Sequence, residues 1–241
     1  MGISIGTMRG GLTGGLLAWL GFTAPSAIAM IIFAILLKGY NFGNAVWIHG
    51  LKIVAVAIVA QAVLTMWQKL VTDNKLATIA IAAMVFLLFK QTALSQIVII
   101  AAAGSAGLLI YRSSAESDSS AATVAVGYKT GVFALVMFFV LLFFLPVMRQ
   151  VTGNNIIALA DSFYRPGALV FGGGHVVLPL LEFEVVPTGW ITKDDFLAGY
   201  GAAQAVPGPL FTFAAYIGTM ISGVSGGMLA LVAIFLPGYL L

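Results

Sequence analysis

The sequence contains no cysteine and few charged residues, and each shortage excludes a class of protein. Without cysteine the chain can form no disulfide, no thiolate metal site and no cysteine nucleophile. Charged residues occupy 8% of the 241 positions, whereas an average soluble domain has about 25%. Apolar residues make up 61% and gather in long runs. Such a chain cannot cover a soluble surface, so we predict an integral membrane protein.

The basic residues give a net charge of +3, but they stand singly at the ends of apolar runs. This is the anchoring pattern of membrane helices, and we expect no nucleic-acid partner. Runs of about 20 apolar residues cross the hydrocarbon layer. The predicted spans lie at about 14–37, 45–70, 76–89, 94–111, 129–148 and from 226 onward. The span at 76–89 is short for a crossing, and Pro25 should kink the first span.

After residue 150 the apolar chain is repeatedly broken by glycine and proline. Irregular backbone at membrane depth is tolerated only where protein or a water-filled cavity surrounds it. We therefore predict short and re-entrant helices between 154 and 210. Thr192 is a predicted helix N-cap, because two acidic residues follow it in the first turn. The expected fold class is an all-α, polytopic membrane helix bundle with broken helices.

The two ends of the chain also resemble each other. Residues 5–26 match 217–238 at ten of 22 positions without a gap, which indicates an internal repeat. Residues 1–150 would then hold the spans of the first repeat, without its N-terminal part, and 151–241 the start of the second. We expect the chain to be the middle of a longer two-repeat protein. Small residues four apart within both copies favour close helix packing, namely Gly11 with Gly15 and Gly223 with Gly227.

A run of three glycines followed by histidine is the first candidate binding site. Gly172, Gly173 and Gly174 leave their backbone N–H groups unobstructed. A helix beginning after them, at about 176–181, would point its positive end at the glycines, which suits an anion. His175 could add a donor or a proton. The alternative is tight packing at a helix crossing with a buried histidine.

The second candidate site combines Gln204 with Pro207, Gly208 and Pro209. Two prolines around a glycine break a helix, and Pro209 favours the start of the next one. That helix would begin at membrane depth, and Gln204 could supply a neutral donor; a simple kink is the alternative. Lys52, inside the second span, is a third candidate, although its long side chain could instead reach the headgroups.

Other chemistry has little support in the sequence. Four carboxylates cluster near the broken region, and we interpret them as a solvated face, with Glu182 as a candidate for proton coupling; they are Glu182, Glu184, Asp194 and Asp195. Enzyme motifs with a nucleophile or a metal-binding histidine pair are absent, and only two histidines occur. We therefore expect no enzyme, no cofactor and no metal site.

The same segments resemble the chromate ion transporter family in its long form. The resemblance rests on 171–180, 189–200 and 204–209, with support from 10–25 and 50–63. It implies a secondary transporter that moves chromate, and sulfate as well, across the inner membrane and so gives chromate efflux and resistance. It also implies two homologous halves in inverted orientation. The expected partners are the oxyanion and the lipid bilayer, and a homodimer is left open. The alternatives are a non-transporting scaffold subunit and a transporter of another oxyanion.

Overall fold

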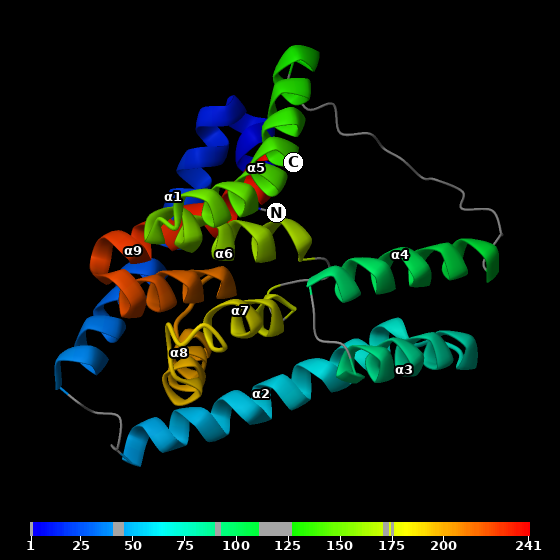
Figure 1. Ribbon diagram of the computed structural model, residues 1–241, viewed down its shortest axis with the longest axis horizontal. Helices are drawn as coiled ribbons and strands as arrows, with labels where there is room; N and C mark the ends of the chain where they lie inside the picture. The colour runs from blue at the N-terminus through cyan, green and yellow to red at the C-terminus, as the bar shows by residue number, and fades with distance from the viewer. Residues whose placement is uncertain (1, 41–45, 90–92, 111–126, 171–173, 175) are drawn as a thin grey trace. The chain divides into compact units, whose positions relative to one another are not determined.

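The computed structural model describes residues 2–40, 46–89, 93–110, 127–170, 174 and 176–241. Within these residues every regular element is a helix, which confirms the predicted all-α fold (Figure 1). In chain order the elements are α1 (Gly2–Tyr40), α2 (Val46–Leu70), α3 (Asn74–Phe89), α4 (Ala93–Ile110), α5 (Tyr128–Thr152), α6 (Asn155–Leu169), α7 (Val177–Val185), α8 (Lys193–Ala205), the 3₁₀ helix η2 (Leu210–Thr212) and α9 (Phe213–Leu240).

Four described segments are long and apolar enough to cross a membrane: Ser4–Gly39, His49–Leu70, Tyr128–Thr152 and Leu210–Leu240. Large apolar side chains on them are exposed, as in α5, where Phe133 and Phe143 are 64% and 68% accessible. Exposing such area to water is unfavourable by about 25 cal/mol per Å². These surfaces therefore face lipid, and the protein crosses the membrane several times.

The chain forms two compact units, residues 1–57 with 124–241, and residues 58–123. The second unit holds the rest of α2 together with α3 and α4. The helix α3 has 16 residues, none of them buried, and the described apolar part of α4 is Val98–Ile110. Both are shorter than a full crossing, as we predicted for the first of them. The repeat boundary predicted near residue 150 concerns ancestry and stays a prediction.

In the first unit, α1 and α9 each contain one break, and the two breaks share a backbone conformation. In α1, Gly10 has φ −139° and ψ 22°, and Gly11 has φ 63° and ψ −160°. In α9, Ser222 has φ −131° and ψ 25°, and Gly223 has φ 69° and ψ −164°. The pairs stand at the same offset as the sequence repeat. The two segments therefore fold alike where the repeat aligns them. Pro25 keeps helical backbone angles, and the break in α1, 14 positions earlier, was not predicted.

Each break turns its helix back on itself. A Cβ on Gly6 would overlap the Gly14 carbonyl oxygen and would lie 2.8 Å from the Cβ of Ala18. In a straight helix, residues eight apart are separated by about 12 Å along the axis, so the two arms must fold together. Gly218 repeats the contact with Gly226 in α9. Both elements are therefore tight helical hairpins with glycine at their closest approach.

The predicted packing role of Gly11 and Gly223 is wrong. Neither glycine has an atom from outside its local helix within 4 Å of the place a Cβ would occupy. Both instead have a positive φ combined with an extended ψ, a region that is essentially restricted to glycine. Their partners do pack: Gly15 is buried, and Gly227 lies against Thr219 of the opposite arm.

The two hairpins pack against each other in opposite directions. The Tyr239 hydroxyl donates to the Leu12 carbonyl at 3.0 Å, and the rings of Trp19 and Phe235 lie 5.6 Å apart. Farther along α1, Lys38 Nζ donates to the Met220 carbonyl at 3.2 Å. The residue number in α9 falls as the number in α1 rises, so the helices are antiparallel. Antiparallel copies are what an inverted repeat requires.

The helix α6 packs on both α5 and α9 within this unit. The Tyr164 hydroxyl donates to the Phe138 carbonyl of α5 at 3.0 Å. On α9, the Ile234 carbonyl lies so close to Gly167 that a Cβ there would overlap it. Phe163, between these two contacts, is fully buried. These contacts fix the helix that leads into the glycine run.

Candidate functional site

The helix predicted after the glycine run is present as α7. It begins at Val177, with Val176 as its N-cap. Gly172, Gly173 and His175 lie outside the described residues. Gly174 is described, and a Cβ added to it would lie 2.9 Å from the Cβ of Leu210. The end of the glycine run therefore touches the start of η2, more than 30 positions later in the chain.

The second break lies where the prolines predict it. The helix α8 ends at Ala205, and η2 begins at Leu210 with Pro209 as its N-cap. Thr212 closes the new turn, since both its N–H and its hydroxyl donate to the Pro209 carbonyl, at 3.0 and 2.9 Å. The first N–H groups of a helix have no partner within it and carry its positive dipole end. The start of η2 is therefore suited to an anion.

Gly208 of this break lies against α1. A Cβ on Gly208 would overlap the hydroxyl oxygen of Ser26 and would lie 2.6 Å from its Cβ. Ser26 is fully buried, and Thr23, one turn earlier on α1, is 2% exposed. No sequence motif marks either hydroxyl as a site residue, although Thr23 and Ser26 flank the predicted kink at Pro25. The contact with Gly208 distinguishes Ser26 from an ordinary helix residue.

Gln204 is in the last turn of α8, close in sequence to the break. Its side chain is half-buried, with Nε2 shielded from solvent, and it interacts with the side chain of Tyr200, one turn earlier on α8. Gln204 therefore lies beside the break, and its role as a ligand stays a prediction.

Lys52 lies away from the two breaks. Its Nζ forms an ion pair of 3.0 Å with Asp194 Oδ1, in the first turn of α8. Gln204 is ten residues farther along α8, which is about 15 Å in a helix. A backbone contact of Leu51 with Gly201 holds α2 against α8 here. The structure thus brings Gly174, Gln204 and 207–209 into one region and leaves Lys52 outside it.

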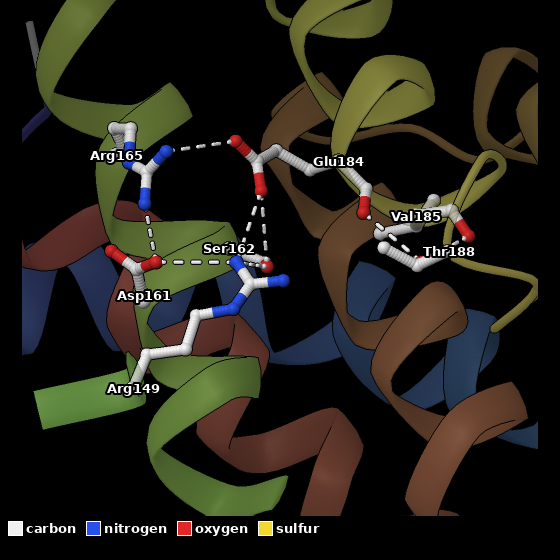
Figure 2. Close-up of polar contacts among 7 residues, drawn as sticks. All are labelled: Arg149, Asp161, Ser162, Arg165, Glu184, Val185 and Thr188. Carbon is white, nitrogen blue, oxygen red and sulfur yellow. Dashed lines mark hydrogen bonds and ion pairs between the residues drawn. The ribbon is translucent and has the colours of Figure 1, made fainter. Parts of the chain in front are cut away.

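A cluster of charged side chains, which we name the charge cluster, joins α5, α6 and α7 (Figure 2). Arg149 Nη1 lies 3.2 Å from Asp161 Oδ2, 3.1 Å from the Ser162 hydroxyl and 3.4 Å from Glu184 Oε2. Arg165 reaches the same two carboxylates, pairing with Asp161 and lying 3.2 Å from Glu184 Oε1. Two guanidinium groups thus face two carboxylates, and the formal charges cancel.

The charge cluster is enclosed by protein. The Asp161 side chain is 2% exposed and that of Glu184 is 10% exposed. Arg149 is also positioned by Trp190, whose ring centre lies 5.8 Å from its guanidinium carbon. The prediction that Glu184 belongs to a solvated face is therefore wrong. Glu182, two residues earlier and so on the opposite side of α7, does pair at the surface with Lys193 at 3.4 Å.

The charge cluster ties together the two helices that flank the glycine run. Arg165 is in the last turns of α6, and Glu184 is near the end of α7. Their ion pair links the helices that precede and follow residues 170–176. Because breaking an ion pair with little exposure is unfavourable, we expect the cluster to restrain the position of Gly174.

Several known proteins are similar to this chain. A sequence model of the chromate transporter family matches residues 1–108 and 157–241. The chromate transport protein of Pseudomonas aeruginosa is 25% identical over 243 residues, which cover 98% of this chain and 56% of that protein. An uncharacterized transporter of Methanocaldococcus jannaschii is 21% identical over 245 residues, 98% of this chain and 59% of the relative.

A shorter match concerns the probable chromate transport protein of Synechococcus elongatus, 37% identical over 84 residues, 34% of this chain and 21% of that protein. No solved structure matches the chain. The chain spans just over half the length of the two relatives that it matches along its whole extent. With the family matched over most of its residues, this membrane-spanning chain belongs to the chromate transporter family.

Proposed function

We propose that the chain is the central part of a secondary transporter that carries chromate across the inner membrane and out of the cell. The observation that carries this proposal is the contact between Gly174 and Leu210. It brings together two helix starts that come from distant parts of the sequence. Transporters with broken helices direct such half-helix N-termini at anionic substrates.

The physical chemistry of a dianion in lipid supports this site. Chromate must exchange its water shell for fixed donors, because an unsolvated charge in a low-dielectric medium is very unfavourable. Backbone N–H groups and neutral side chains supply donors without a full opposite charge that would trap the ion. The proposed ligands are Gly172, Gly173, Gly174, His175, Gln204, Pro207, Gly208 and Pro209, the prolines acting by exposing the neighbouring N–H groups.

Sulfate has the same shape and charge as chromate, so we propose it as a second substrate or a competitor of this site. Lys52, paired with Asp194 at the other end of α8, has the narrower role of attracting the anion. The antiparallel hairpins of α1 and α9 support an inverted repeat, in which two related halves would enclose the substrate. A homodimer stays an open arrangement.

The test is uptake of labelled chromate into vesicles that contain the protein, with sulfate as competitor. We expect wild-type vesicles to accumulate chromate and excess sulfate to reduce the rate. Gly208→Leu should insert normally and lose uptake, because a side chain there overlaps Ser26. Gly21→Leu is the matched control, since Gly21 has open space around it. Wild-type vesicles that take up no more chromate than empty ones would refute the proposal.

The alternative of a non-transporting scaffold makes a different prediction for the same variants. If the glycines serve only helix packing, Gly208→Leu should change the assembly of the protein in the membrane. The wild-type protein should then bind no oxyanion at all. Measuring chromate binding to the purified wild type therefore separates the two functions.

A further inference from the structure

Thr23 differs from other threonines within the described helices. The hydroxyls of Thr65, Thr78 and Thr219 each donate to the carbonyl four residues earlier, at 2.8, 2.8 and 2.7 Å. Such bonds are the usual way for a helical threonine to satisfy its hydroxyl. Thr23 is 2% exposed, yet its Oγ1 has no hydrogen-bond partner among the described residues. A buried hydroxyl is thus available and unused.

This hydroxyl belongs to the part of α1 that meets the second break. Ser26, one turn later, donates its hydroxyl to the Thr23 carbonyl at 3.0 Å. The same Ser26 side chain contacts Gly208, and the Phe22 carbonyl lies 3.9 Å from the position a Cβ on Gly208 would take. Residues three apart share one side of a helix. Thr23 therefore lies on the side of α1 that faces the break.

A second polar side chain lies at the same break. Gln204, in the last turn of α8, has its Nε2 shielded from solvent and interacts with the side chain of Tyr200. Buried polar groups in native proteins almost always have partners, so each exception needs an explanation. The hydroxyl of Thr23, in the part of α1 that contacts Gly208, is such an exception. An acceptor-rich ligand at this break would satisfy it.

We infer that Thr23 is a further oxyanion-binding residue, whose hydroxyl donates to an oxygen of the anion bound beside Gly208. This inference rests on the proposed function and adds a donor that comes from α1, the first copy of the repeat. Ser26 is a positioning residue, because its own proton is used on the Thr23 carbonyl. Chromate and sulfate both present oxygen acceptors, so this hydroxyl can donate to either oxyanion.

The test is calorimetric titration of three purified proteins with chromate: the wild type, Thr23→Val and Thr23→Ser. Valine keeps the shape and removes the donor, so we expect chromate binding about tenfold weaker, as for one lost bond to a charged group. Serine keeps the donor and should bind within about twofold of wild type. Thr65→Val is the control, because that hydroxyl is satisfied within its own helix, and it should leave binding unchanged.

A second measurement separates ligand binding from packing. Without chromate, Thr23→Val should unfold at the same or a higher temperature, because an unpaired buried hydroxyl has been removed. Equal chromate affinity for Thr23→Val and wild type would overturn the role of Thr23, as would a serine variant as weak as the valine variant. Wild type that binds no oxyanion overturns the proposed function itself. If Thr23→Val does not fold, Thr23→Ala takes its place in the same comparison.

Discussion

Gly11 and Gly223 have the same backbone conformation, with φ 63° and 69° and ψ −160° and −164°. Each is the second residue of a break that turns a membrane helix into a hairpin. The residues before them differ, since Gly10 corresponds to Ser222 at φ −139° and −131°. Only the second position of each break therefore requires glycine.

Gly11→Ala and Gly223→Ala should each destabilise the protein by about 2 kcal/mol, because side chains are strained in this region of backbone conformation. Gly10→Ser is the matched control: it copies the residue that the other hairpin already holds at this place. It should change stability by less than about 0.5 kcal/mol. The measurement is denaturant unfolding in micelles. Equal losses for Gly10→Ser and Gly11→Ala would show that the break has another conformation.

Gly167 tests the packing of α6 on α9. Since a Cβ there would overlap the Ile234 carbonyl, and backbone cannot move aside, Gly167→Ala should cost about 1–3 kcal/mol, as overpacking does. Gly238→Ala, in open space on α9, should be neutral or stabilising, because alanine favours a helix. Thermal unfolding of the two variants checks this. A neutral Gly167→Ala would mean that the two helices are not in contact.

Features set by neighbouring residues could be predicted from the sequence. Thr192 is the N-cap of α8, with Asp195 N–H donating to its hydroxyl at 3.1 Å, because a cap needs only the next few residues. The break at 207–209 is present for the same reason, since proline removes a donor and fixes φ wherever it occurs. The long spans follow from apolar length alone.

Features set by distant residues could not be predicted. The charged residues around Glu184 in the sequence predict a solvated face, and only the fold brings Arg149 and Arg165 to it. Thr23 has no local signal either, since its missing partner is visible only once its burial is known. The role of Gly11 was mistaken because the spacing of small residues does not reveal a positive φ.

The pair of Lys52 and Asp194 offers a test by salt. Lys52 is 20% exposed and Asp194 is 78% exposed, so their coupling in a double-mutant cycle should be below about 1 kcal/mol. If Lys52 attracts the anion, Lys52→Met should weaken chromate association at low salt and Asp194→Asn should strengthen it. Both differences should vanish at about 1 M salt, where the Debye length is about 3 Å. A loss that persists in high salt would instead make Lys52 a direct ligand.

The two glutamates of α7 provide a matched pair for the charge cluster. Glu184 accepts from Arg165 at 3.2 Å and Arg149 at 3.4 Å and is 10% exposed. In Glu184→Gln, the two guanidinium groups share Asp161 as their remaining carboxylate partner within the charge cluster. Breaking a buried pair costs about 3–5 kcal/mol, and since the arginines are about a quarter exposed, we expect about 2 kcal/mol here. Glu182→Gln should cost less than about 0.5 kcal/mol.

The same two variants also test whether the cluster holds the glycine run in place. Glu184→Gln releases the link between α6 and α7, so chromate should bind more weakly even though Glu184 does not touch the proposed site. Glu182→Gln should bind chromate as wild type does, because its partner Lys193 is 69% exposed at the surface. Calorimetric titration of both variants decides the point. If Glu184→Gln lowers stability and leaves chromate affinity unchanged, the charge cluster supports the fold alone, and Gly174 is positioned by its contact with Leu210.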